Sequence, residues 1–131
     1  MIAADTSAWI DHFRGQDSPA SKRLENALSN GSLVLPLHVL FEILSGPGLA
    51  KGAETALLQI PRLEIKTGYW ERAANMRRTL LKSGTKSRSM DCLIAQNCID
   101  HAVGLIAADN DFRHYVKFGL TLAEETRSRK K

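Results

Sequence analysis

The sequence has few cysteines and no long apolar run. Its two cysteines, Cys92 and Cys98, are six positions apart in a segment of helical pattern, so their side chains point about 120° apart around the axis and are hard to bridge. We expect both to be reduced core residues. No stretch approaches the ~18 apolar residues of a membrane span, and no basic region followed by an apolar run opens the chain. These absences predict a soluble, cytoplasmic protein without disulfides.

Aromatic residues make up 6% of the chain, which argues against a surface on which nucleic-acid bases stack. The four histidines, His12, His38, His101 and His114, are scattered without the spacing of zinc ligands. The fragment Gly84-Thr85-Lys86-Ser87 lacks the adjacent Gly-Lys pair and the earlier glycine of a phosphate-binding loop. Zinc chemistry and nucleotide binding of that type are therefore not predicted.

Positive charge is concentrated in the second half of the chain. The 131 residues carry a net charge of +4, and residues 66–131 contain thirteen basic and seven acidic side chains, against five and seven in residues 1–65. This asymmetry is consistent with a polyanionic partner. A solvated helix face with a basic tail at 124–131 explains it equally well.

Short apolar runs alternate with longer segments of helical period, which is typical of βα units on a parallel sheet. We predict one α/β domain over residues 1–123, followed by the basic tail. The predicted strands are Ile2–Ala4, Leu33–Leu35, Leu63–Ile65, Val103–Ala107 and Leu120–Ala123. The predicted helices span residues 7–14, 19–29, 37–45, 50–59, 68–83, 89–101 and 111–117.

Two aspartates directly follow predicted strands. Asp5 follows the first and Asp109 the fourth, and ligand sites of open α/β sheets lie at the carboxyl ends of the strands. Each aspartate could instead cap a helix. At Asp5 this interpretation as a cap is weaker, because Thr6 and Ser7 follow at once and could serve as caps instead.

Two further acids lie in predicted helices. Glu42 is the only acid in the apolar segment LHVLFEIL, which we expect to be buried on several sides. A lone carboxylate there is costly unless it is paired, protonated or metal-bound, although an exposed helix edge would also accommodate it. Asp91 falls in the first turn of the helix from residue 89, where the helix dipole alone could explain an acid.

The four acids are predicted to converge on one cleft. Close carboxylates cannot all stay ionised without a cation, and oxygen ligands suit Mg²⁺ or Mn²⁺. One or two such ions would promote phosphodiester hydrolysis, with Lys82, Lys86, Arg88 and Arg113 holding the nucleic-acid backbone. The alternatives are a non-catalytic module that docks a partner's basic tail and a phospho-acceptor receiver domain.

At these residues the sequence resembles the PIN-domain ribonucleases, and among them the VapC-type toxins of toxin–antitoxin pairs. The matching text is Asp5-Thr6-Ser7, Glu42 in LFEILSG, Asp91 in MDCLIAQNC, and Asp109 with Asp111 in AADNDF. The similarity spans residues 2–118. It implies a three-layer α/β/α fold with a central parallel sheet of about five strands.

The resemblance also implies metal-dependent cleavage of RNA, with tRNA or rRNA as substrate. Asp5 and Asp91 would be the core metal ligands, Glu42 and Asp109 would complete the site, and Thr6 or Ser7 would orient a water or ligand. A homodimer and a cognate VapB-type antitoxin are the implied partners. Relatives often place a hydroxyl residue where this chain has Ala107, so Asn110 is a candidate to replace it, and Asp111 a candidate to share or take over the role of Asp109.

Overall fold

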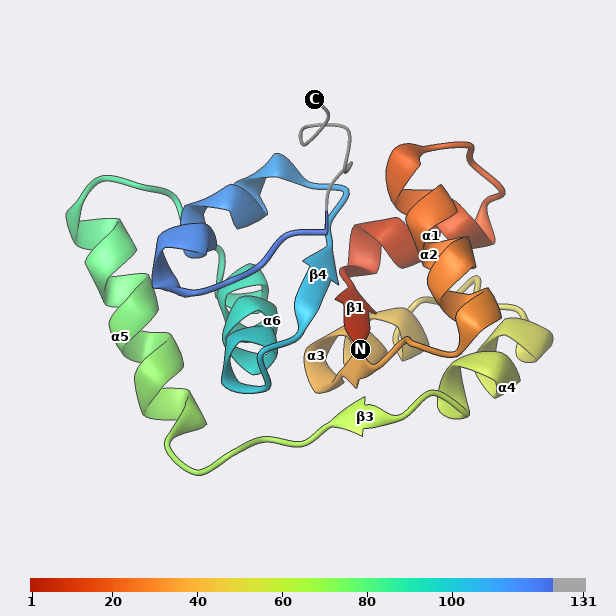
Figure 1. Cartoon of the computed structure of the whole chain (residues 1–131), viewed down its shortest axis with the longest axis horizontal. Helices are drawn as coiled ribbons and strands as arrows, with labels where there is room; N and C mark the ends of the chain where they lie inside the picture. Colours follow the sequence, from red (N-terminus) through yellow and green to blue (C-terminus); the bar gives the residue numbers. More distant parts are fainter. Residues whose placement is uncertain (124–131) are drawn as a thin grey trace.

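The computed structural model describes residues 1–123, and the basic tail 124–131 predicted from the sequence lies outside the described residues. Four short strands alternate with helices along the chain (Figure 1). In order, the elements are β1 (Ile2–Ala4), α1 (Thr6–Phe13), α2 (Pro19–Asn30), β2 (Leu35–Pro36), α3 (Leu37–Leu44), α4 (Lys51–Leu58), β3 (Arg62–Leu63), α5 (Tyr69–Lys82), α6 (Ser89–Asp100), β4 (Gly104–Ile106) and the 3-10 helix η1 (Asn110–Phe118).

The strands are all parallel to their neighbours. β1 pairs with β4, placing Ala4 opposite Ile106, and β2 pairs with β3, placing Pro36 opposite Leu63. A single bridge between Ile2 and Leu33 connects the two pairs. The carboxyl ends of β1 and β4 therefore lie side by side.

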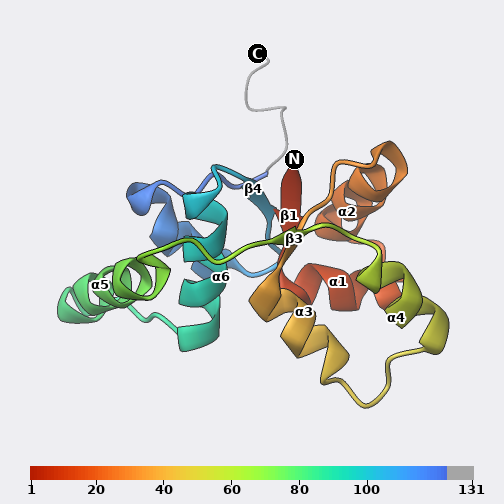
Figure 2. The ribbon, with the colours of Figure 1, turned by 90° about the horizontal axis from the view of Figure 1, so that it is seen from below.

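Helices cover both sides of these strands. α5, α6 and η1 lie on one side and α1, α2 and α4 on the other (Figure 1). Seen from below, α3 lies between α1 and α6 (Figure 2), and it contacts both. Fully buried apolar side chains fill the space between the layers, among them Leu24, Leu35, Leu57, Ile94, Leu105 and Ile106.

The predicted α/β fold with a parallel sheet is confirmed, but the sheet is less regular than the predicted five strands. The fifth predicted strand, Leu120–Ala123, is a single bridge between Leu122 and Leu105. β4 is itself only three residues long, so little edge is available for pairing. Both cysteines are free and buried, as expected. Within residues 1–123, every helix is too short or too polar to cross a membrane.

The expectation that the segment around Glu42 is buried on several sides is wrong. α3 buries Val39, Leu40 and Ile43, whereas Phe41 is 62% exposed and Leu44 39% exposed. α3 contacts α1, α6 and β2, but none of these covers the side that carries Phe41 and Leu44. Glu42 is half-buried.

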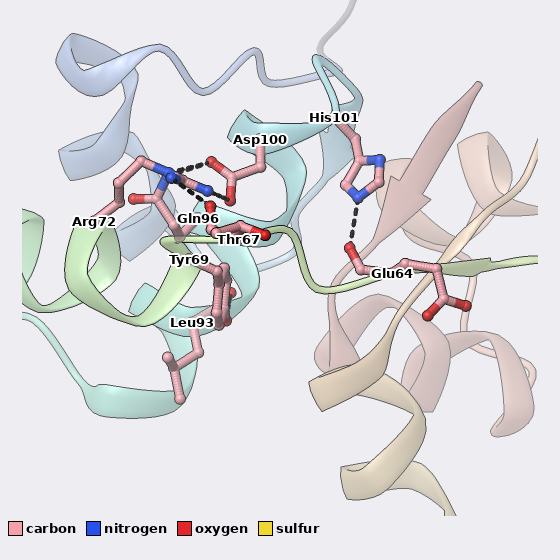
Figure 3. Close-up of polar contacts among 8 residues, drawn as sticks. All are labelled: Glu64, Thr67, Tyr69, Arg72, Leu93, Gln96, Asp100 and His101. Atoms are coloured by element: carbon pink, nitrogen blue, oxygen red, sulfur yellow. Dashed lines mark hydrogen bonds and ion pairs between the residues drawn. The ribbon is translucent and has the colours of Figure 1, made fainter.

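A hydrogen-bonded network fastens α5 to the C-terminus of α6 (Figure 3). Arg72 forms two hydrogen bonds to the Asp100 carboxylate, at 3.0 and 2.7 Å, and a third to the carbonyl of Thr67. Gln96 donates to the same carboxylate at 2.9 Å. A Cβ at Gly68, which has φ +83°, would lie 2.6 Å from the Arg72 guanidinium. The network therefore needs glycine at the start of α5.

Burial alone would raise the pKa of Asp100, but the hydrogen bonds from Arg72 and Gln96 outweigh it and hold the pKa below 3.8. A carboxyl whose folded-state pKa is depressed stabilises the fold above the unfolded pKa and loses that effect as the pH falls through the folded value. We expect Asp100→Asn to lower the thermal midpoint at pH 7 by about 2–4 °C. Below pH 3.8 the thermal midpoints of the variant and the unmodified chain should move closer together. Calorimetric scans in which the two midpoints differ by the same amount at pH 7 and pH 3 would contradict this.

Candidate metal centre

Asp5 lies at the end of β1, where its backbone N–H donates to Ile106 of β4 at 2.9 Å. The side chain is 2% exposed and caps α1, accepting from the N–H of Ala8 at 2.7 Å. Of the caps considered from the sequence, Asp5 itself is the one used and Thr6 and Ser7 are not, because the helix already begins at Thr6 and Asp5 holds the extended capping conformation. The N–H of Ala108 also lies 3.3 and 3.4 Å from the two carboxylate oxygens.

Asp109 and Asp111 belong to the segment that leaves β4. Asp109 caps η1, accepting from the N–H of Asp111 at 2.9 Å. Both acids are half-buried. One oxygen from each, together with one from Asp91, lies within 4.8 Å of the others. This group, Asp91, Asp109 and Asp111, is called the acid cluster below.

Asp91 supplies the third acid of the cluster from the first turn of α6. Its Oδ2 atom is buried and has no hydrogen-bond partner among the described residues. A buried carboxylate oxygen without a partner loses the hydrogen bonds that water would give it. The helix dipole, which favours an acid in this turn, leaves that oxygen unexplained.

Glu42 and Thr6 form one side of the site. The Thr6 hydroxyl donates to Glu42 Oε1 at 2.5 Å, which joins α1 to α3. Ser7 and Asn110, the other two predicted supporting residues, are exposed at the first turns of α1 and η1. Ala107, at the position where a hydroxyl was expected, is half-buried.

Burial, with a smaller contribution from neighbouring acids, raises the pKa values of two of these carboxyls. Burial raises the pKa of Asp5 to about 6; the backbone hydrogen bonds oppose this rise and the charge of Asp109 adds to it. Burial also raises the pKa of Asp91; the charges of Asp109, Asp111 and Glu42 increase the effect, while Arg88 opposes it. All four sequence-predicted acids and Asp111 therefore face a common region.

This donor set fits a hard divalent cation. The acid cluster offers only oxygen ligands, and such ligands suit Mg²⁺ or Mn²⁺ better than zinc. A cation would also satisfy the unpartnered Asp91 Oδ2 and offset the mutual repulsion of the acids.

Two basic side chains, Lys86 and Arg88, lie near the acids. Lys86 Nζ lies 3.9 Å from Asp111 Oδ2, and Arg88 immediately precedes α6. Lys82 at the end of α5 and Arg113 in η1 are exposed. The four predicted RNA-binding residues thus come from the end of α5, from the α5–α6 connection and from η1.

The PIN-domain family model matches residues 2–117. The chain belongs to the PIN-domain family. Two VapC ribonucleases, Mb1587 of Mycobacterium bovis and VapC11 of Mycobacterium tuberculosis, are each 32% identical to it over 120 residues, covering 86% of this chain and 89% of theirs. This PIN-domain chain is thus homologous to VapC ribonucleases.

Solved structures share the PIN fold. A VapBC2 complex of Rickettsia felis bound to promoter DNA aligns with a TM-score of 0.68 at 19% identity, covering 94% of this chain and 98% of that one. FitAcB of Neisseria gonorrhoeae aligns at 0.66 and 16% identity, with 95% and 97% covered. This fold removes the receiver-domain alternative.

Sequence reasoning missed two side chains next to the acids. From the sequence Ser87 is only the last residue of the rejected phosphate-loop fragment, yet it is 4% exposed and its hydroxyl lies 2.7 Å from that of Tyr115 in η1. Tyr115 is 1% exposed. A buried serine in a polar loop has no distinguishing sequence pattern, so only the three-dimensional structure reveals this pair.

The raised pKa of Asp5 predicts that this residue destabilises the metal-free fold at neutral pH. A carboxyl with a folded pKa of about 6 and an ordinary value of 3.8 carries a penalty of up to about 3 kcal/mol above pH 6, and the penalty disappears as the pH falls toward 3.8. Asn also caps helices well. Asp5→Asn should therefore stabilise the metal-free protein at pH 8 and have little effect at pH 4.

Denaturant unfolding at both pH values, with chelator present, measures this difference. Asp17→Asn, at an exposed residue paired with Lys22, is the matched control and should show no such gain. An Asp5→Asn variant that is less stable than the parent at pH 8 would contradict the assignment.

Proposed function

We propose that this chain is a divalent-metal-dependent endoribonuclease that acts as the toxin of a VapC-type toxin–antitoxin pair in the cytoplasm. The observation that carries the proposal is the acid cluster with the buried, unpartnered Oδ2 of Asp91. Homology to VapC ribonucleases supports the substrate class. The excess of basic residues in the second half supports a polyanionic substrate.

Asp91, Asp109 and Asp111 would hold Mg²⁺, or Mn²⁺ in its place, with Asp5 and Glu42 completing the site. When bound, the cation would lower the pKa of a water and neutralise charge on the scissile phosphate. Asp5 is itself fixed by backbone N–H groups from both α1 and the segment after β4. Thr6 orients the Glu42 carboxylate through its hydroxyl.

The basic side chains around the acids would hold the RNA backbone. Lys86 and Arg88 lie nearest to the acid cluster. Lys86 contacts Asp111, and Arg88 is three residues before Asp91 in the sequence. Lys82 and Arg113 extend the positive surface along α5 and η1. Contacts to phosphates give affinity without base readout, so these four residues position RNA and do not select a sequence within tRNA or rRNA.

An apolar groove next to Glu42 is suited to the antitoxin. It is lined by Ile10 and Phe13 of α1, Ile43 of α3, and Leu49 and Ala53 beyond the Gly46-Pro47-Gly48 turn. Ile10 and Phe13 are each 37% exposed. We propose that an apolar segment of a VapB-type antitoxin fills this groove and that a basic side chain following it pairs with Glu42 and neighbouring acids.

A second apolar surface supports the proposed homodimer. Trp70 and Leu81 of α5 are 57% and 47% exposed. Trp70 and Leu81 also border a groove between α5 and α6. Large exposed apolar side chains of this kind mark interaction surfaces, and we assign this one to a second copy of the chain.

The nuclease proposal is tested with purified protein, Mg²⁺ or Mn²⁺ and structured RNA. Asp91→Asn should reduce cleavage by more than about 100-fold, because an amide is a poorer metal ligand and carries no charge. Asp5→Asn should do the same. Asp100→Asn is the matched control, since it makes the same change on the same helix away from the acid cluster, and it should cut RNA normally.

Full cleavage by both Asp5→Asn and Asp91→Asn would exclude this mechanism. Calorimetry with Mn²⁺ distinguishes the nuclease from the remaining alternative. A folded chain that binds no Mn²⁺ and cuts no RNA would be a non-catalytic module that docks a partner's basic tail.

The dimer is tested by Trp70→Glu, which places a charge in the proposed contact. Sedimentation equilibrium should show a dimer for the parent chain and a monomer for the variant at the same concentration. Leu58→Glu on α4, where Leu58 is 40% exposed, is the matched control and should remain dimeric. A monomeric parent chain, or a dimeric Trp70→Glu variant, would contradict the assignment.

A further inference from the structure

We propose that Ser87 and Tyr115 are positioning residues that set the spacing of the acid cluster. Their hydroxyl oxygens lie 2.7 Å apart in the interior, and they join the two segments that carry the acids. Ser87 precedes α6, which holds Asp91, and Tyr115 lies in η1, which follows Asp109 and contains Asp111. The inference rests on the proposed metal site and assigns it a supporting hydrogen bond.

The start of α6 is tied to neighbouring segments through Ser87. Within residues 1–123, no side chain caps this helix, whose capping residue is Arg88. Ser87, a potential cap by residue type, instead shares its hydroxyl between Tyr115 and the Cys92 thiol of α6. Its carbonyl accepts from Arg77 Nε of α5 at 2.8 Å. Ser87 therefore connects the α5–α6 loop to α5 on one side and to η1 on the other.

The distances along the chain are short. Asp91 is four residues after Ser87, and Asp111 is four residues before Tyr115. In the 3-10 helix η1, four residues span about 8 Å along the axis. Ser87 and Tyr115 are 4% and 1% exposed, so water cannot readily replace a lost hydroxyl partner. A shift between the loop and η1 would then change the separation of Asp91 from Asp111.

A metal site would be sensitive to such a shift. The three ligand oxygens lie within 4.8 Å of one another, and Mg²⁺ requires near-octahedral geometry with ligands at about 2.0–2.1 Å. Residues that orient ligands without touching the ion typically change metal affinity by about 10–100-fold. Ser87 and Tyr115 fall in this group because neither belongs to the acid cluster.

The test measures Mn²⁺ affinity by calorimetry, independently of RNA cleavage. Tyr115→Phe removes only the hydroxyl and should weaken Mn²⁺ binding about tenfold. Tyr69→Phe is the matched control, because Tyr69 is also fully buried and its hydroxyl also donates to the α6 region, to the carbonyl of Leu93 at 2.6 Å. It should lose stability but keep the parent affinity.

Ser87→Ala removes the other hydroxyl of the pair and should weaken Mn²⁺ binding as much as Tyr115→Phe. Ser87→Thr keeps the hydroxyl and should bind Mn²⁺ with the affinity of the parent chain. The double variant Ser87→Ala/Tyr115→Phe should bind Mn²⁺ no more weakly than either single variant, because both changes remove the same hydrogen bond. In the metal-free protein, deuterium exchange of the backbone amides of residues 84–91 should rise in Tyr115→Phe but not in Tyr69→Phe. This measurement reports on the α5–α6 loop independently of metal binding.

Parent affinity in a folded Tyr115→Phe or Ser87→Ala variant would overturn the inference. An equal loss of affinity in Tyr69→Phe would also overturn it, because the effect would then be one of general stability. A parent chain that binds Mn²⁺ but cuts no RNA would instead contradict the proposed function and leave the positioning result standing.

Discussion

The burial of several carboxylates close together at one end of a parallel sheet is the constraint on which the rest of this structure depends. β1 and β4 run side by side and deliver Asp5 and Asp109 to the same edge, where α6 adds Asp91 and α3 adds Glu42. Burial and like charge raise the pKa values of Asp5 and Asp91. The fold tolerates this arrangement because backbone N–H groups hold Asp5 and because a cation can occupy the remaining oxygens.

The elements around the site serve to hold these acids close. Asp5 and Asp109 each cap the helix that follows them, so the same side chains fix the local backbone and supply acidic oxygens. The Arg72–Asp100 network secures the far end of α6, and the hydrogen bond between Ser87 and Tyr115 secures the near end. A rigid site of this kind is expected where ligand geometry must be exact to a few tenths of an ångström.

Much of this was predictable from the sequence. The alternation of apolar and helical segments predicted the parallel α/β fold, and the positions of Asp5 and Asp109 after strands predicted the edge at which they lie. Local pattern could not predict that α3 exposes Phe41, because burial depends on which neighbours a helix meets. It also could not reveal the Ser87–Tyr115 pair, since the two residues are 28 positions apart. The sequence indicated Asp111 as a candidate but could not decide between Asp111 and Asp109, and both belong to the acid cluster.

The most direct test of the account is a crystal structure of the chain grown with Mn²⁺, with data collected at the manganese absorption edge. The account predicts an anomalous peak about 2.2 Å from oxygens of Asp91 and of Asp109 or Asp111, with Asp5 and Glu42 beside it. A folded protein that shows no peak there under saturating Mn²⁺, or in which these carboxylates point to separate regions, would contradict it.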